Sequence, residues 1–281
     1  MRRIAVLTHK RPEETSACLA VMIDLAARHG VELVLDANEV AKHHLVPGPG
    51  LALEQDAAAD VDLCIVLGGD GTILKALALY AGTNVPVFAI NFGAIGFLAT
   101  VERDDIPAAF TRALAGDFEV LRLPALGVEL VAGHMRALND VAVHRRVGER
   151  VAEMAYALDG EEAGSVRCDG LVVSTPAGST GYNLANGGPV MAWGVEGFVV
   201  SFIAPHSLSA RALVVAPGDG MTIFNRGSDP LEVAVDGRPV GTIDGGGSLA
   251  VRYERDVSIL AQLPATTFYG RLREKFGRLA S

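Results

Sequence analysis

The chain has 281 residues, of which 50% are hydrophobic and 20% are charged, and this composition excludes a wholly disordered protein. The 24 Lys and Arg residues and 33 Asp and Glu residues give a formal net charge of −9, which argues against nucleic acid or an anionic membrane as the main partner. The length allows two domains, or one large one, that fold without disulfides. Cys18, Cys64 and Cys168 are far apart and form no CxxC pair, which fits a reducing cytosol.

The first third of the chain alternates between short apolar runs and helical segments. No apolar run has the length of a signal peptide's core or the roughly 20 residues that span a bilayer, so we expect a soluble, cytoplasmic protein. Continuous apolar strands separated by helices indicate a parallel, Rossmann-like sheet covered on both faces. We expect strands at Ile4–Thr8, Val31–Leu35, Asp62–Leu67 and Val85–Ile90, and helices at Glu13–His29, Thr72–Tyr80 and Asp104–Ala115.

From about Glu119 to Gln262 the sequence changes to short strands. Turn dipeptides such as Asp159-Gly160 and Asp236-Gly237 separate them and are typical of hairpins. This pattern predicts an antiparallel, β-rich, sandwich-like domain. The expected strands are Leu126–Val131, Met135–Val143, Val151–Leu158, Gly170–Ser174, Phe198–Ile203, Leu213–Val215, Met221–Phe224, Leu231–Val235, Ser248–Arg252 and Val257–Ala261.

The tail, Thr266–Leu279, returns to a helical pattern. Its residues Phe268, Leu272, Phe276 and Leu279 are spaced by four, four and three, which predicts an amphipathic helix that packs back on the body. We therefore expect an α/β domain made of residues 1–100 with the C-terminal helix 266–281, and a β-rich domain over residues 101–265.

The first glycine cluster, Gly68-Gly69-Asp70-Gly71-Thr72, follows a predicted strand and precedes a predicted helix. Such a loop presents backbone N–H groups and a helix N-terminus to a phosphate. A carboxylate is unfavourable beside phosphates, so Asp70 is better explained as a base for a hydroxyl or as a magnesium ligand. The alternative is an ordinary turn in which Asp70 caps the helix. The cluster matches neither the P-loop nor the dinucleotide fingerprint.

Two further glycine clusters follow predicted strands. The segment Asn91–Leu98 is expected on the same sheet edge as the first cluster, and it is equally well explained as a domain-exit turn. The stretch 167–189 is rich in Gly, Ser, Thr and Asn, which suits a polyhydroxylated, phosphate-bearing ligand, although a solvated connecting loop is the alternative. Ser179 lies in GSTG and not in GxSxG, so a serine hydrolase is disfavoured.

Together these segments resemble the NAD kinase family over most of the chain. Gly68–Thr72 looks like its GGDGT motif, which diacylglycerol, sphingosine and 6-phosphofructo-kinases share. More specific is Asp169-Gly170 followed by 174–182, STPAGSTGY, which is similar to the family's DG…STPTGSTAY signature. Further similarities are the NxGxxGFL segment at Asn91–Leu98, the Asn-acid pair at Asn139-Asp140, and the PHSLS element at Pro205–Ser209.

The sequence departs from the family pattern at a few positions. Ala177 and Gly181 replace the usual Thr and Ala, which affects loop flexibility. Arg238 replaces the commoner Gln after Asp236-Gly237, so one polar contact to the ligand is in doubt. Ala212 stands where Pro usually follows Arg211. None of these changes removes a residue that the chemistry needs.

The resemblance implies transfer of a γ-phosphoryl group from ATP or polyphosphate to the adenosine ribose 2′-hydroxyl of NAD, which gives NADP. It makes Asp70 the general base. The loop residues Gly68, Gly69, Gly71 and Thr72 would leave room for the donor phosphates, and Mg²⁺ would offset charge on the transferring group. No HExxH motif or Cys/His cluster suggests a structural metal.

The resemblance also implies which residues line the NAD site. An arginine at position 167 looks associated in that family with members that use NAD alone, so we predict a preference for NAD over NADH. His206 is equally well explained as a loop histidine and as a ligand contact, and the pair His43-His44 is expected at the surface. The expected lining is Asp70, Gly71, Lys75, Asn139, Asp140, Arg150, Arg167, Asp169, Thr180, Gly181, Tyr182, Asn183, Leu184 and Ala185.

Two other functions compete with this one. A lipid or sugar kinase of the same superfamily would need a large apolar groove in place of the hydroxyl-rich 174–186 loop. A catalytically silent dinucleotide-binding regulator has no need of Asp70. The expected partners are the small molecules NAD and ATP, with no nucleic acid and no membrane. Because a β-rich domain leaves sheet edges to cover, we also expect a homodimer or homotetramer.

Overall fold

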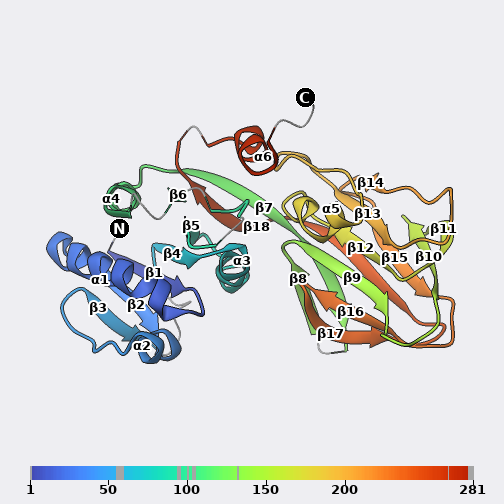
Figure 1. Ribbon diagram of the computed structural model, residues 1–281, viewed down its shortest axis with the longest axis horizontal. Coiled ribbons are helices and arrows are strands. Elements are labelled where there is room, and N and C mark those ends of the chain that lie inside the picture. The colour runs from blue at the N-terminus through green and yellow to red at the C-terminus, as the bar shows by residue number, and fades with distance from the viewer. Residues whose placement is uncertain are drawn as a thin grey trace. The chain divides into compact units, whose positions relative to one another are not determined.

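A computed structural model describes residues 2–54, 60–93, 96–99, 101–102, 106–131, 133–264 and 266–277. The chain forms two compact units (Figure 1). The first unit is Met1–Arg122 with Ser258–Ser281, and the second is Leu123–Val257. No helix in the described part of the chain is long and apolar enough to cross a membrane.

The first unit is built on a parallel sheet with the strand order β3-β2-β1-β4-β5-β18, with β6 also paired to β5. Every residue of β4 is buried, as expected for an apolar strand in the middle of a parallel sheet. The strands are β1 (Arg3–Thr8), β2 (Glu32–Asp36), β3 (Leu51–Glu54), β4 (Leu63–Gly68), β5 (Pro86–Asn91), β6 (Val101–Glu102) and the end of β18 (Ser248–Gln262).

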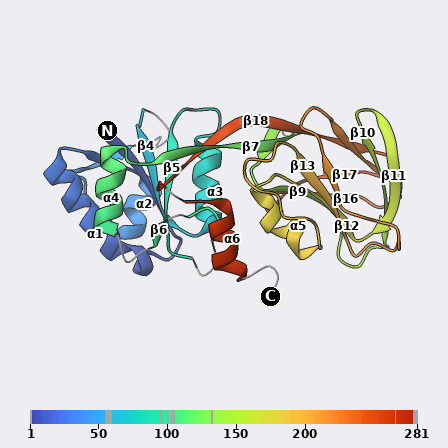
Figure 2. The same cartoon turned by 90° about the horizontal axis from the view of Figure 1, so that it is seen from above.

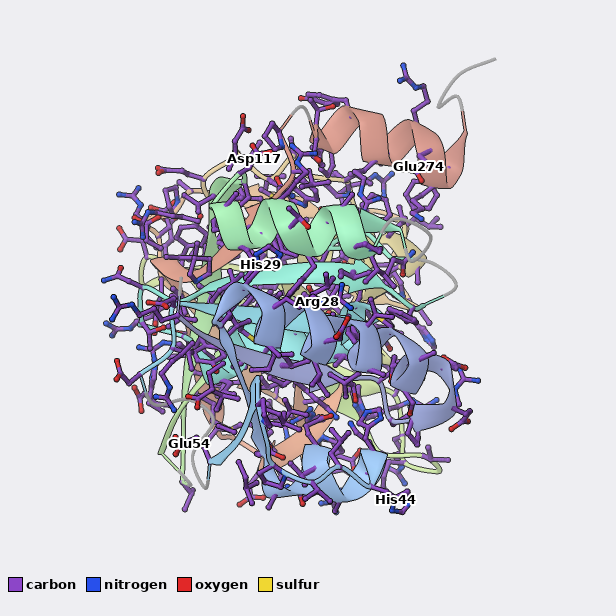
Figure 3. All side chains as sticks on the ribbon, turned by 90° about the vertical axis from the view of Figure 1, so that its left-hand side faces the viewer. Arg28, His29, His44, Glu54, Asp117 and Glu274 are labelled. Atoms are coloured by element: carbon purple, nitrogen blue, oxygen red, sulfur yellow. The ribbon has the colours of Figure 1, made fainter. Side chains whose placement is uncertain are left out.

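Helices cover both faces of this sheet. Figure 2 shows α1 and α4 on one side and α3 on the other, and Figure 3 looks onto the side where α1 and α4 lie together. Helix α1 ends where Gly30 adopts the left-handed conformation, with φ 65°. The helices of this unit are α1 (Pro12–His29), α2 (Ala37–His43), α3 (Asp70–Leu79), α4 (Ile106–Ala115) and α6 (Phe268–Phe276).

The second unit is β-rich and encloses one apolar core. Its six-stranded antiparallel sheet has the order β14-β13-β12-β9-β16-β17, and β11, β10, β15 and β18 form a second antiparallel group, with β7 paired to β18 and β8. Leu171 and Phe198 of the first group and Met154 and Ile223 of the second belong to one buried cluster, as in a sandwich. The expected fold class is thus confirmed.

The bounds of the second unit's elements are as follows. The strands are β7 (Glu119–Leu130), β8 (Gly133–Ala137), β9 (Asp140–Arg145), β10 (Ala152–Leu158), β11 (Glu161–Cys168), β12 (Gly170–Ser174), β13 (Phe198–Ile203), β14 (Leu213–Val215), β15 (Met221–Asn225), β16 (Leu231–Val235), β17 (Arg238–Ile243) and most of β18. A 3₁₀ turn, η2 (Gly178–Thr180), and the short helix α5 (Tyr182–Ala185) complete it.

The division of the chain differs from the expected one. Residues 101–122 and 258–265 belong with the α/β unit and not with the β-rich unit. The reason is packing: α4 lies against α1, and β18 pairs in parallel with β5, placing Ile259 opposite Pro86. Parts of two expected helices, residues 104–105 and 278–279, lie outside the described residues.

Candidate active site

The candidate residues fall into two groups, one in each unit. In the first unit, β4 ends at Gly68 and α3 begins at Asp70, with Gly69 between them. A Cβ atom on Gly68 would lie 2.6 Å from the Cβ of Thr72, so this position requires glycine. At Gly71 no heavy atom of the described residues, apart from its neighbours and the helix backbone, lies within 4 Å of the place a Cβ would take, which leaves space at the start of the helix. The loop has the geometry that suits a phosphate.

The segment Asn91–Leu98 packs on this loop. Strands β4 and β5 are parallel and place Gly68 opposite Asn91, so both glycine clusters lie at the same sheet edge, as predicted. A Cβ on Gly93 would lie 3.0 Å from the Cα of Gly69, and one on Gly96 would lie 3.1 Å from Oδ1 of Asp70. The glycines here allow two backbones to approach closely. Ala94 and Ile95 lie outside the described residues.

The carboxylate of Asp70 is held by the same segment. The backbone N–H of Phe97 donates to Oδ2 at 2.9 Å, and that of Leu98 donates to Oδ1 at 3.2 Å. Burial raises the pKa of Asp70, and these two hydrogen bonds and the charges of Arg271 and Lys275 on α6 oppose the rise. Asp70 is therefore a fixed carboxylate whose proton affinity exceeds that of an ordinary aspartate.

In the second unit two carboxylates lie together where β8 and β9 meet. Asp236 accepts hydrogen bonds from the backbone N–H groups of Leu138 (3.0 Å), Asn139 (2.7 Å) and Asp140 (3.2 Å). These bonds break the expected single strand Met135–Val143 into β8 and β9. Burial and the charge of Asp236 raise the pKa of Asp140 to about 7, and burial also raises the pKa of Asp236.

The loop after β12 folds over this turn. The hydroxyl of Thr175 donates to the carbonyl of Leu138 at 2.6 Å, and the N–H of Gly178 donates to the Thr175 hydroxyl at 3.0 Å. A Cβ on Gly178 would lie 2.0 Å from the carbonyl oxygen of Asn139, so only glycine fits. The loop thus fixes the position of Asn139 and Asp140.

The expected lining residues of this loop differ in how deeply they are buried. Asn183 is fully buried, and its amide donates to the carbonyls of Ser179 at 2.9 Å and Pro189 at 3.0 Å, so its side chain holds the loop together. Gly181, Tyr182 and Ala185 are exposed. Thr180 and Leu184 are half-buried.

A third acidic residue of this unit, Asp169, lies close to this loop and forms an ion pair with Arg145. Nε and Nη2 of Arg145 donate to its two carboxylate oxygens at 2.6 and 3.3 Å, and this lowers the pKa of Asp169. His206 adds a further electrostatic contribution in the same direction. Burial, together with Asp140 and Asp169, raises the pKa of Tyr182. The structure thus brings Asp140, Asp169 and Tyr182 into one electrostatic group.

The expected cations are exposed. Arg150 and Arg167 line a pocket of about 220 Å³ in the second unit together with Arg145 and the acidic residues Glu149, Glu153 and Asp229. Lys75 is exposed on α3, four residues after Gly71 and hence on the same helix face.

Three residues of the candidate site were not expected from the sequence: Arg145, Arg271 and Lys275. Arg145 comes to Asp169 only through the fold, because β9 pairs with β12 and so places His144 opposite Gly170, next to Asp169. No motif marks the other two as site residues, since the tail was identified only as an amphipathic helix. The fold of the first unit brings α6 close enough for the charges of Arg271 and Lys275 to act on the Asp70 carboxylate.

No group of three or more His, Cys, Asp or Glu side chains within the described residues is placed to hold a metal ion. A dedicated protein cage is therefore not found in that part of the chain. The chemistry of a carboxylate beside a phosphate-binding loop still suits Mg²⁺, which proteins commonly bind through one or two carboxylates plus the phosphates of the substrate.

A glycine loop with a fixed carboxylate at the edge of a parallel sheet suits transfer of a phosphoryl group to a hydroxyl, and the fold adds a β-rich unit with carboxylate-bearing loops. A family model described as the ATP-NAD kinase N-terminal domain matches residues 25–118, and one described as the ATP-NAD kinase C-terminal domain matches residues 138–256. The chain belongs to the NAD kinase family.

Individual relatives agree with this assignment. An NAD kinase of Gemmatimonas aurantiaca is 34% identical over 98% of this chain and 96% of its own length, and one of Leifsonia xyli subsp. xyli is 36% identical over 98% and 94%. The crystal structure of an NAD kinase from Archaeoglobus fulgidus in complex with ATP matches with a TM-score of 0.72 and 25% identity, over 98% of this chain and 97% of that one. The crystal structure of yeast NADH kinase complexed with NADH shares the fold, with a TM-score of 0.87 and 24% identity over 100% of this chain and 89% of that one.

Proposed function

We propose that the protein transfers the γ-phosphoryl group of ATP, or the terminal phosphoryl group of polyphosphate, to the adenosine ribose 2′-hydroxyl of NAD, and so forms NADP. Asp70 carries this proposal: a carboxylate that two backbone amides fix beside a phosphate-type glycine loop is placed to act as a base. Membership of the NAD kinase family supports the choice of substrates.

Asp70 acts as the general base for the hydroxyl. Each of its carboxylate oxygens accepts one backbone N–H and keeps a lone pair for a proton. As the 2′-oxygen forms a bond to the γ-phosphorus, the hydroxyl proton passes to Asp70. The bond from that phosphorus to the bridging oxygen breaks, and its electron pair leaves on ADP or on the shortened polyphosphate.

The donor phosphates lie at the N-terminus of α3. Gly68, Gly69, Gly71 and Thr72 form this end of the helix, whose unpaired N–H groups and dipole favour negative charge. Mg²⁺ bound to the donor phosphates would offset the negative charge on the transferring group. The residues of this chain fit that arrangement, because Asp70 is a hard oxygen ligand next to the loop.

In the first unit Asp70, Gly71 and Lys75 contact NAD. In the second unit the acidic residues accept hydroxyl, amine or amide hydrogens, the arginines meet phosphates, and the loop at 180–185 contacts the nucleotide. Asn183 contributes by holding that loop, since its amide is engaged within it. The second-unit set is Asn139, Asp140, Arg150, Arg167, Asp169, Thr180, Gly181, Tyr182, Asn183, Leu184 and Ala185.

The proposed setting is the cytoplasm, and the proposed assembly is a homodimer or homotetramer. Cys18, Cys64 and Cys168 are buried free thiols, which agrees with a reducing compartment. Strand β14 ends the six-stranded sheet and exposes Leu213 and Val214, so this edge supports pairing with another copy. Light scattering in solution tests the assembly.

The reaction itself is tested with the purified chain, NAD, Mg²⁺ and either ATP or polyphosphate. The expected product is NADP, with its new phosphate at the 2′ position by ³¹P NMR. Binding of NAD without any product from either donor would favour a silent regulator. Turnover of a lipid or sugar in place of NAD would favour another kinase of the superfamily.

A further inference from the structure

Helix α6 carries two cations on the side that it buries. Phe268, Arg271 and Leu272 are its buried residues, so an arginine occupies the face that the sequence pattern assigns to apolar packing. Arg271 is 7% exposed. Lys275 lies one turn further along, with a side chain that is only 14% exposed.

The guanidinium of Arg271 is incompletely paired. Its Nη1 lies 3.5 Å from Oε2 of Glu274, which Figure 3 labels on the same helix. Its Nε and Nη2 are buried, and neither has a hydrogen-bond partner among the described residues. An arginine cannot shed its charge, so burying it without partners is unfavourable. An anion that binds this edge of the guanidinium would remove that cost.

The same helix packs on the segment that holds the proposed base. The ring centroids of Phe276 and Phe97 are 5.3 Å apart, and the backbone N–H of Phe97 donates to Asp70. Arg271 and Lys275 are close enough to Asp70 for their charges to act on it. The ion pairs among the described residues nevertheless join Arg271 to Glu274 and not to Asp70. The Nε and Nη2 edge of Arg271 is thus without a partner among the described residues, and the charge of this side chain acts on the carboxylate of Asp70.

We propose that Arg271 binds the terminal phosphate of the phosphoryl donor, with Lys275 adding a second positive charge. The N–H groups on Nε and Nη2 form a planar fork that matches two oxygens of one phosphate. This inference rests on the proposed function, which places the donor phosphates at Gly68–Thr72. A nucleoside triphosphate and an inorganic polyphosphate share the terminal phosphate that the fork would bind.

The alternative is that Arg271 only packs the helix, and the two roles predict different stabilities. A packing residue loses stability when it is replaced. A buried guanidinium whose Nε and Nη2 lack partners in the described part of the chain is costly in the free protein, so Arg271→Met should keep the melting temperature of the wild type or raise it. Arg273 is the matched control, because it is exposed on the same helix.

The test compares Arg271→Met, Arg271→Lys and Arg273→Met as full-length proteins. We expect Arg271→Met to lower kcat/KM for ATP by about 10²–10³-fold, the usual effect of removing a donor to a transferring group. Calorimetry should show weaker binding of inorganic tripolyphosphate with Mg²⁺, while the affinity for NAD stays unchanged. Arg271→Lys should retain an intermediate rate, and Arg273→Met should behave as the wild type.

Chemical rescue keeps the proposal testable if Arg271→Met folds poorly. Guanidinium ion at a concentration below the unfolding range should restore part of the rate of Arg271→Ala and none of the rate of Asp70→Asn. Separate assays with ATP and with tripolyphosphate as donor show whether the fork serves one donor or both. Unchanged ATP turnover and unchanged tripolyphosphate affinity in Arg271→Met would overturn the proposal. If the wild type binds tripolyphosphate through Arg271 yet forms no NADP, the binding site stands and the proposed reaction fails.

Discussion

At the scale of single residues, opposing effects act on the pKa of Asp70. Burial raises its pKa, while two backbone amides and two cations of α6 oppose the rise. The amides also fix the carboxylate, and a base acts efficiently only when it is positioned. The second glycine cluster is therefore best understood as support for the first, because it supplies both amides.

Asp140 should make NAD binding depend on pH. Its pKa is raised to about 7, and its ionised carboxylate accepts an N–H of NAD more strongly than the protonated acid does. Because the ionised fraction rises as pH increases, we expect the affinity for NAD to rise about tenfold from pH 6 to pH 8, with proton release on binding. Calorimetry in buffers of different ionisation enthalpy measures both effects. Asp140→Asn should bind NAD more weakly and with a flat pH profile; a profile like that of the wild type would contradict the role.

Arg167 is predicted to accompany a preference for NAD over NADH. The two nucleotides carry the same phosphates, so any discrimination must arise around the nicotinamide ring. Arg167 is exposed and lines the 220 Å³ pocket. We expect kcat/KM for NAD to exceed that for NADH by about tenfold or more, a common size for discrimination by contacts. Arg167→Gly should lower the ratio of kcat/KM for NAD to kcat/KM for NADH. Comparable turnover of NAD and NADH by the wild type would contradict the prediction.

At the scale of elements, Gly178 couples the loop after β12 to the β8–β9 turn. Because a Cβ there would lie 2.0 Å from the carbonyl oxygen of Asn139, Gly178→Ala must displace backbone. We expect a loss of about 1–3 kcal/mol in the free energy of unfolding and a higher KM for NAD. Denaturant unfolding and steady-state kinetics measure these changes. Gly194→Ala is the control, since in the part of the chain that the structure describes no heavy atom except those of its chain neighbours lies within 4 Å of the added Cβ; equal behaviour of the two variants would refute the coupling.

Most of the strands predicted from the sequence bury apolar side chains, such as β4 and β12, and the exposed edge strand β14 was predicted from its apolar residues alone. It missed β11 and β17, which end their sheets and are mostly exposed, so no apolar pattern marks them. It divided β18 at the charged Tyr253–Asp256, although the backbone pairing continues on both sides. It also missed α2 and β3, two short elements of the first unit.

The site was predictable where motif residues cluster in sequence, as at Gly68–Thr72. It was not predictable where the fold joins distant residues. Arg145 pairs with Asp169 across a strand pair, and Asp236 meets Asp140 across about a hundred positions. The surface prediction for His43 was wrong for the same reason: its side chain is 1% exposed and bonds Thr8 on β1 and Ser16 on α1. The exposed His44 agrees with that prediction.

At the scale of the whole molecule, the net charge of −9 contrasts with where the cations lie. In the second unit Arg145, Arg150 and Arg167 line a pocket, but Glu149, Glu153 and Asp229 line it too, so the pocket is not a concentration of positive charge. In the first unit the charges of Arg271 and Lys275 act on Asp70, and an acidic protein needs such local positive charge where it binds an anionic nucleotide. Close approaches explain part of the use of the chain's 32 glycines: Gly93 and Gly178 lie against neighbouring backbone, and Gly68 lies against the Thr72 side chain.

The most direct test of the central claim is the rate of NADP formation by Asp70→Asn at saturating NAD, ATP and Mg²⁺. The substitution keeps the size of the side chain, removes its ability to accept the hydroxyl proton, and leaves one oxygen in place of the two that accept the backbone N–H groups of Phe97 and Leu98. We expect kcat to fall by about 10²–10⁴-fold, the usual contribution of a general base, while the affinity for NAD changes little. A variant that keeps the full rate would show that Asp70 is not the base.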